Sequence, residues 1–245
     1  MARSPRTDPR RALEALEAEV VSCVRCPRLV AYRTEVARVR RKQFRDQVYW
    51  GRPVPGFGDP CARLLVVGLA PAAHGGNRTG RIFTGDRSGD WLFEALHRFG
   101  FANQPFSHHR DDGLELRGAY VTAAVRCAPP ANKPTREELE NCRPYLVREL
   151  ELLRGVRIVV ALGKIAWDAY FAARAAACRP VPKPRPKFAH GARVDLGDVL
   201  LLGSYHPSQQ NTFTGKLTRR AFHAIFARVR RSLGERRLDR SRGLR

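Results

Sequence analysis

Residues 64–89, LLVVGLAPAAHGGNRTGRIFTGDRSG, decide the fold of this chain. The segment begins with four consecutive apolar residues, which are typical of a strand buried on both faces of a parallel sheet. Residues 68–89 then contain six glycines, one aromatic side chain, one acid and three arginines. Turn-forming residues dominate this loop, and a helix is expected to begin near Ser88. In an α/β sheet, such a loop lies at the edge where ligands bind.

Three further apolar runs resemble this strand, and segments with helical periodicity separate them. The expected strands cover residues 63–69, 119–125, 157–162 and 199–204. The expected helices cover residues 9–22, 29–42, 88–99, 135–153, 164–176 and 216–233. This alternation predicts an α/β protein with a three-layer αβα fold and a central, mainly parallel four-stranded sheet. We expect a single domain over residues 10–235, flanked by basic, disordered tails at 1–9 and 236–245.

Two more of the expected strands are followed by unusual loops. Residues 126–134, RCAPPANKP, follow the second strand, and residues 205–211, YHPSQQN, follow the last one. Because the carboxyl ends of parallel strands lie at one edge of a sheet, the three loops are expected to form one site.

The six cysteines suggest a cofactor without identifying it. Four of them form two pairs, Cys23-x2-Cys26 and Cys127-x14-Cys142. Structural zinc sites usually have two closely spaced pairs, whereas a [4Fe–4S] cluster takes one thiolate per iron and tolerates uneven spacing. Spacing alone therefore leaves an iron–sulfur cluster, zinc and unligated thiols open. Cys61 and Cys178 are expected to be small residues of the core.

The charge of the chain indicates a polyanionic partner. The formal net charge is +22 over 245 residues, and the isoelectric point is about 11.1. Nine arginines lie in residues 1–12 and 235–245, but most of the excess positive charge lies between these ends. Such a balance favours DNA or RNA without separating the two.

The same composition argues against secretion and membrane insertion. The N-terminus has no apolar signal segment, and no apolar run approaches the length of a membrane span. We therefore expect a cytoplasmic protein, associated with the nucleoid through DNA, that acts as a monomer.

Three motifs together resemble the type-5 uracil-DNA glycosylases, an iron–sulfur branch of the uracil-DNA glycosylase superfamily. They are GLAPAAHGGNRTGRIFTGDRSG, CAPPANKPT and SYHPSQQNTFTGKLT. The resemblance runs from about residue 23 to residue 220. It implies a uracil-DNA glycosylase-like fold and a [4Fe–4S] cluster held by Cys23, Cys26, Cys127 and Cys142. It also implies removal of a deaminated base, uracil above all, from DNA, with an abasic site as product.

The chemistry of base excision suggests three catalytic candidates. Positive charge develops on the sugar and negative charge on the departing base, so an anion and a hydrogen-bond donor are needed. Asp86 is the anion in the first loop, although it could instead cap the helix that follows. His206 could donate to the base, or be a structural histidine. Asn132 could read the base edge or hold water, or be a turn residue.

Further residues of the same loops are expected to contact substrate. Phe83 offers a flat face on which a flipped base could stack, unless it is a core residue. A glycine-rich loop also offers backbone donors to phosphates. The expected substrate-binding residues are Gly68, Ala70, His74, Asn77, Arg78, Phe83, Gln209 and Gln210. No lysine stands out as an imine-forming nucleophile, so hydrolysis without strand cleavage is expected.

Two other functions fit part of this pattern. One is a non-catalytic nucleic-acid-binding module with a redox-sensing iron–sulfur cluster. The other is an enzyme that acts on free nucleosides or nucleotides. An acid and a histidine on separate loops favour an enzyme, and the basic body favours a polymeric substrate.

Overall fold

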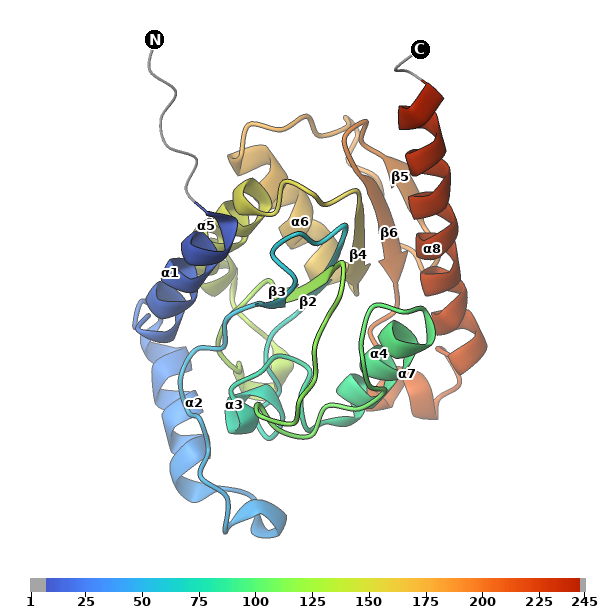
Figure 1. Ribbon diagram of the computed structural model, residues 1–245. Helices are drawn as coiled ribbons and strands as arrows, with labels where there is room; N and C mark the ends of the chain where they lie inside the picture. Colours follow the sequence, from blue (N-terminus) through green and yellow to red (C-terminus); the bar gives the residue numbers. More distant parts are fainter. Residues whose placement is uncertain (1–7, 243–245) are drawn as a thin grey trace.

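The sheet at the centre of the molecule has six strands in the order β1-β3-β2-β4-β6-β5 (Figure 1). This computed structural model describes residues 8–242, with side chains described through residue 234. The strands are β1 Phe57–Gly58, β2 Leu64–Gly68, β3 Ala119–Ala123, β4 Ile158–Leu162, β5 Arg193–Asp195 and β6 Leu200–Ser204.

The four expected strands form the parallel centre of this sheet, but the expected count of four was wrong. β2, β3, β4 and β6 pair in parallel, as the continuous apolar runs predicted. The additional strands, β1 and β5, are only two and three residues long and pair antiparallel at the two edges. Segments this short carry no readable apolar pattern, which is why the sequence did not reveal them.

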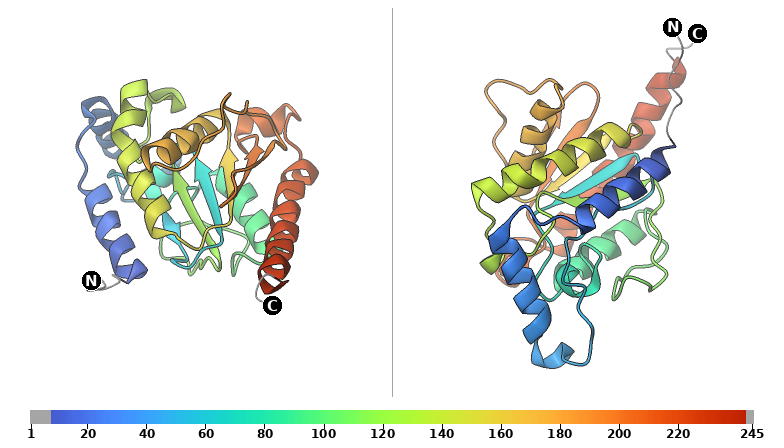
Figure 2. Two further views of the ribbon diagram at one scale, coloured as in Figure 1. Left: turned by 90° about the horizontal axis from the view of Figure 1, so that it is seen from above. Right: turned by 90° about the vertical axis from the view of Figure 1, so that its left-hand side faces the viewer.

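Helices cover both faces of the sheet, which confirms the three-layer αβα architecture (Figure 2). Side chains of α4 and α8 pack on one face, and those of α5 and α6 pack on the other. The helices are α1 Pro9–Val21, α2 Pro27–Val39, α3 Gly76–Thr79, α4 Arg87–Arg98, α5 Arg136–Leu152, α6 Lys164–Ala176, α7 Gln209–Phe213 and α8 Arg219–Arg242, with 3-10 turns η1 Lys42–Phe44 and η2 Pro130–Asn132.

Capping residues explain where the helices begin. The Asp8 side chain accepts a hydrogen bond from the backbone N–H of Arg10 at the start of α1. Thr135 and Glu138 form the expected capping box at the start of α5, each side chain bonding the other's backbone N–H. At the other end of the chain, α8 continues to Arg242 and so passes the expected domain boundary at residue 235. Residues 1–7 and 243–245 of the expected tails lie outside the described residues.

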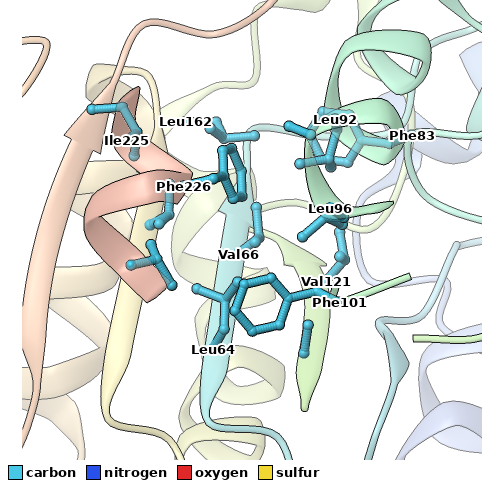
Figure 3. Packing of buried hydrophobic residues seen from close by; sticks show 14 of the residues in the cluster. Leu64, Val66, Phe83, Leu92, Leu96, Phe101, Val121, Leu162, Ile225 and Phe226 are labelled. Carbon is cyan, nitrogen blue, oxygen red and sulfur yellow. The ribbon is translucent and has the colours of Figure 1, made fainter. Parts of the chain in front are cut away.

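The core follows directly from the apolar strands. In β2, Leu64 and Val66 face α4 and α8, whereas Leu65 and Val67 face α5 and α6, and all four side chains are fully buried. Figure 3 shows Leu64 and Val66 among the side chains of the first of these clusters. Burial of one such side chain stabilises the fold by about 1.5–3 kcal/mol. None of the helices within the described residues is both long enough and apolar enough to cross a membrane.

The register of the sheet aligns the ends of its parallel strands. Gly68 at the end of β2 lies opposite Ala123 at the end of β3, and Leu162 of β4 lies opposite Ser204 of β6. The loops that follow β2, β3 and β6 therefore leave the sheet at one edge, the one formed by the carboxyl ends of the parallel strands, as the sequence predicted.

Candidate active site

The loops at this edge border a cleft of about 1050 Å³. Its lining comes from α2 and the segment after it, from the loop after β2 and the first turn of α4, from the loops before and after β3, and from the first turn of α7. The sequence-predicted residues among the lining are His74, Arg78, Asp86, Asn132 and Gln209.

Asp86 is both the N-cap of α4 and a wall residue of the cleft. Its Oδ1 accepts a hydrogen bond from the Gly89 N–H at 3.0 Å, while a Cβ on Gly75 would lie only 2.2 Å from its Oδ2. Only glycine at position 75 therefore leaves room for this carboxylate. Burial raises the pKa of Asp86 to about 6, with Asp90 adding to the shift and backbone hydrogen bonds and Arg78 opposing it. The carboxylate is mostly ionised at neutral pH.

His206 follows β6 and lies beside the first loop. Its ring stacks on that of Phe83, with the ring centroids 5.7 Å apart and the planes 26° apart. The residue is half-buried, and the loss of water around its ring lowers its pKa to about 4. Asn211 donates from Nδ2 to the carbonyl oxygen of His206 at 2.8 Å, which fixes the backbone of this loop. A neutral imidazole is therefore held at the carboxyl edge of the sheet.

Phe83 joins the site to the core. Its backbone is left-handed, with a φ of 55°, and only 5% of its surface is exposed. Figure 3 shows Phe83 close to Leu92 of α4. A Cβ on Gly68 would lie 2.7 Å from the Phe83 ring, so this glycine allows the ring to approach the end of β2. Phe83 and His206 form a pair beside the cleft and are not among the residues that line it.

Backbone strain gathers around this site. Within the described part of the chain, five residues other than glycine have a positive φ, and Phe83, Ala131 and Asn132 are three of them. Residues held in this region of conformational space cluster at functional sites. Asn132 itself is exposed, lies at the end of η2 and lines the cleft.

His74 and Arg78 organise the first loop. The Nδ1 atom of His74 lies 3.0 Å from the hydroxyl of Tyr49, and burial lowers the pKa of His74, with Arg41 and Arg78 adding to the effect. The Arg78 guanidinium donates to the carbonyl oxygens of His74 and Gly85 at 2.8 and 2.9 Å. Arg78 thus closes the glycine-rich loop on itself.

Of the remaining residues that were expected to contact substrate, some lie inside the protein and others lie on its surface. Asn77 is fully buried and donates to the Arg33 carbonyl oxygen at 3.2 Å, so it anchors α3 to α2 and does not reach the cleft. Ala70 packs against the cysteines. Gln209 and Gln210 are exposed in the first turn of α7, and Gln209 lines the cleft.

Sequence reasoning missed one whole wall of the cleft. This wall is formed by Tyr32, Arg41, Gln43, Phe44, Gln47 and Val48, together with His108 and His109 from another loop. The Arg78 guanidinium lies 4.0 Å from the Phe44 ring centroid, and its Nη1 donates to Gln47 Oε1 at 2.6 Å. In the sequence, the run of basic residues before Tyr49 was the available signal for this wall of the cleft. The segment lies next to the loop after β2 because of these long-range contacts, which the sequence does not reveal.

The four paired cysteines come together away from the cleft. Cys26, Cys127 and Cys142 pack in one buried cluster with Leu29 and Val125, and Cys23 lies beside it against Leu16, Val20 and Tyr145. Burial raises the pKa of Cys127 to about 12 and that of Cys142 to about 11, and the neighbouring thiols add to both shifts. Across residues 8–234, no three His, Cys, Asp or Glu side chains have the geometry of a metal-ion site.

Charges around these thiols fit a larger anionic group. Arg33 is 6% exposed, and its Nε has no hydrogen-bond partner in the described part of the molecule. This guanidinium lowers the pKa of Cys127, although burial outweighs it. A buried cation with an unused donor is costly unless an anion lies beside it. A cluster that binds one thiolate per iron also needs its sulfurs farther apart than a single ion does.

The two other cysteines do not belong to the core. Cys61 and Cys178 are exposed, so the expectation that they are small buried residues was wrong. Both lie in turns, where a short polarizable side chain is tolerated without burial.

Comparisons with known proteins agree on one family. The family model described as the uracil DNA glycosylase superfamily matches residues 55–230. A type-5 uracil-DNA glycosylase of Mycobacterium tuberculosis (strain CDC 1551 / Oshkosh) is 53% identical over 221 residues, which cover 89% of this chain and 81% of that protein. A type-5 enzyme of Thermus thermophilus is 51% identical over 222 residues, 90% and 98% of the two chains. A type-4 enzyme of Pyrobaculum aerophilum is 32% identical over 161 residues, 65% and 74%.

Proposed function

The chain belongs to the uracil-DNA glycosylase superfamily and, within it, to the type-5 uracil-DNA glycosylases, and from this membership we propose that it is a monofunctional DNA glycosylase of base excision repair. It hydrolyses the N-glycosidic bond of uracil in DNA, and of other deaminated bases, and leaves an abasic site. It therefore acts inside the cell, on DNA.

One observation supports this proposal above the others. Asp86 and His206 reach the same edge of the sheet from separate strands. Burial lowers the pKa of His206 to about 4, which leaves its imidazole neutral at pH 7. Burial raises the pKa of Asp86 to about 6, which is still below pH 7 and leaves its carboxyl mostly ionised. Pairs of titratable groups whose pKa values are moved by their surroundings mark acid, base and charge-stabilising roles.

The two side chains match the two charges of the reaction. As the glycosidic bond breaks, the sugar becomes cation-like, and the Asp86 carboxylate stabilises that charge or orients the attacking water. The departing base becomes an anion, and a neutral His206 donates a hydrogen bond to its carbonyl oxygen without a full proton transfer. The loop after β2 has no acid or amide between Gly68 and Gly76. Asp86 is the only acidic residue within residues 68–89.

The remaining residues hold the base. Phe83 provides an apolar ring beside His206, on which an extruded base stacks. Asn132 offers its exposed amide from the lining of the cleft, where it hydrogen-bonds the base edge or a water. Gln209 and Gln210 lie next to the cleft and occupy the space that the extruded nucleotide leaves.

We also propose that Cys23, Cys26, Cys127 and Cys142 hold a [4Fe–4S] cluster. Cys23 and Cys26 lie in the connection between α1 and α2, Cys127 lies in the loop after β3 and Cys142 lies in α5, so a cluster ties these elements together. Hydrolysis needs no electron carrier, and the group is structural. Arg33 supplies positive charge beside the thiolates.

An excision assay tests the activity. The protein is incubated with a labelled oligonucleotide that contains one uracil, and the products are separated before and after treatment with alkali. We expect strand breaks only after alkali, because hydrolysis leaves an intact backbone with an abasic site. Breaks without alkali would show a lyase activity and refute the monofunctional mechanism.

The same assay separates the alternatives. A non-catalytic binding module would bind the oligonucleotide without releasing uracil. An enzyme for free nucleosides would release uracil from deoxyuridine as readily as from the polymer. Oligonucleotides with hypoxanthine or xanthine in place of uracil measure the breadth of the base pocket.

Metal analysis and absorption spectra test the cluster. Protein purified without oxygen is expected to be brown and to contain about four irons per chain. Alanine at Cys23, Cys26, Cys127 or Cys142 should remove the colour, whereas alanine at the exposed Cys61 or Cys178 should not. Zinc without iron in such a preparation would overturn the assignment.

A further inference from the structure

The segment between α2 and β1 forms an arm beside the cleft. We define the arm as residues 38–48, which contain the end of α2 and the turn η1. Figure 1 and the right-hand view of Figure 2 show α2 and this turn extending away from the body of the molecule. Arg41, Phe44, Gln47 and Val48 also line the cleft that contains Asp86. The arm is therefore continuous with the candidate active site.

The arm carries unneutralised positive charge. It contains five basic residues and a single acid, Asp46. Arg38 is paired with Glu35 at 2.7 Å. The side chains of Arg41, Lys42 and Arg45 are exposed, and none of the three forms an ion pair within residues 8–234. Three free cations next to the cleft are complementary to a phosphodiester backbone.

Apolar side chains accompany these charges. Val48 is 86% exposed and Val39 is 61% exposed, which makes them two of the most exposed large hydrophobic residues within the described part of the chain. A solvated face would not need them, whereas a nucleic-acid contact combines cations for phosphates with apolar groups for sugars and bases.

Contacts to the catalytic loop hold the arm in place. Arg78 lies over the Phe44 ring and donates to Gln47, while its other nitrogens bond the carbonyl oxygens of His74 and Gly85. Within the arm, Arg40 donates to the carbonyl oxygen of Arg45 at 2.8 Å. An arm fixed in this way loses little conformational freedom on binding. Its position is also coupled to the loop that carries Asp86.

The size of the cleft fits a ligand larger than one base. A volume of about 1050 Å³ reaches the upper end of pockets that hold drug-sized molecules. A single pyrimidine occupies a small part of it. The wall formed by the arm is therefore left for nucleotides that flank the extruded one.

We propose that the arm binds the DNA strand on one side of the target nucleotide. Lys42 and Arg45 contact its phosphates, and Val48 packs against a flanking nucleotide. This inference rests on the proposed glycosylase function and assigns a DNA contact to a surface that takes no part in the chemistry.

The salt dependence of binding tests the proposal. The variant Lys42→Gln/Arg45→Gln is compared with Arg117→Gln/Arg154→Gln, which removes two exposed cations before β3 and β4, at the opposite edge of the sheet. The probe is a long duplex with one 2′-fluoro-deoxyuridine, whose glycosidic bond resists cleavage. Each lost phosphate contact reduces the slope of log affinity against log salt by about one. The arm variant should therefore lose about two from the slope, and the control variant should keep the parent slope. Equal slopes in the two variants would overturn the proposal.

Trimming the duplex gives a second, independent test. Duplexes are shortened stepwise from one side of the uracil and then from the other. The difference in affinity between the parent and the arm variant should disappear when one side is trimmed and persist when the other is trimmed. If the difference in affinity stays the same whichever side is trimmed, the proposal is overturned. If the parent excises uracil while the variants bind alike, only the arm assignment fails; if the parent excises no uracil, the proposed function itself fails.

Discussion

At the scale of single residues, Asp86 combines two roles that the sequence presented as alternatives. Its Oδ1 caps α4 through Gly89, and its Oδ2 lies against Gly75 at the cleft. Capping therefore holds the carboxylate in position and does not exclude it from chemistry. The start of α4 also places partial positive charge next to it, yet burial outweighs this effect and raises its pKa to about 6.

This pKa sets the expected pH dependence of excision. The single-turnover rate should rise with pH as the Asp86 carboxyl ionises around pH 6, because only the anion stabilises the sugar cation. His206, with a pKa of about 4, stays neutral through this range and adds no further step. Rates measured across pH for the parent and for Asp86→Asn check this. The variant should lose the step, and an unchanged step would assign it to another group.

Asp86→Asn also separates capping from catalysis. Asparagine caps a helix about as well as aspartate, so the folding free energy should change little. If the charge acts in catalysis, single-turnover excision should fall by about tenfold or more at neutral pH. The measurement is the rate with enzyme in excess, beside a thermal melt. Rates within about twofold of the parent, with an unchanged melt, would leave Asp86 with the capping role alone.

His206→Ala tests stabilisation of the leaving base. The neutral ring is positioned by Phe83 and by the bond from Asn211 to its backbone. Removing one donor to a developing anion costs about 10²–10³ in rate, and the ground-state affinity for DNA should barely change. Single-turnover rates and binding to uncleavable DNA measure the two effects separately. Equal losses in both would indicate a binding role instead.

Sequence reasoning located residues of the strand-end loops but not the partners of their side chains. Asp86 and His206 follow apolar strands, and the topology of a parallel sheet was enough to bring them to one edge. Asn77 shows the limit. It looked like a ligand contact, yet its amide bonds a carbonyl 44 residues away, and no local pattern encodes that contact.

At the scale of elements, a buried charge network joins the end of β3 to α5. Arg126 lies 2.6 Å from Glu149, both side chains are 2% exposed, and Thr122 donates to the same carboxylate at 2.7 Å. Burial alone would lower the pKa of Arg126, but Glu149 outweighs it and raises the pKa. The network holds the segment that continues into Cys127.

Glu149→Ala should therefore destabilise the fold strongly. Loss of one partner leaves the Arg126 charge buried and unpaired, which costs about 3–5 kcal/mol. Glu140→Ala, which removes the partner of the exposed Arg136, should cost less than about 1 kcal/mol. Denaturant unfolding measures both. Similar costs for the two variants would show that water reaches the Arg126 pair.

Elements were predictable where their own residues specify them. The central strands are continuous apolar runs, α5 begins with a capping box, and α6 covers residues 164–176 as expected. The short helix α3 was missed because contacts distant in sequence hold it. The N–H groups of Trp50 and Gly51 donate to the carbonyl oxygens of Arg78 and Asn77. The edge strand β5 depends in the same way on its pairing with β6.

At the scale of the whole molecule, two kinds of packing coexist. The sheet and its helices share two large apolar clusters. The N-terminal helices contribute little to them: α1 adds Leu13 to one, while Leu16, Val20 and Leu29 pack in small clusters around the cysteines. The stability of this region therefore depends on the cysteines more than that of the sheet does.

The proposed cluster makes iron removal a test of this division. Chelation under reducing conditions should loosen residues 9–39 and the arm first, because their apolar clusters are small and contain the thiols. The sheet should keep its fold, since Leu64 to Val67 and their partners are buried without any cysteine. Excision should nevertheless fall, because α2 holds α3 through the bond from Asn77 to Arg33, and α3 belongs to the catalytic loop. Hydrogen exchange, followed along the chain before and after chelation, measures this order. Protection lost equally in β2 and α2 would show that the molecule unfolds as one unit, and unchanged protection in α2 would remove the structural role of the cluster.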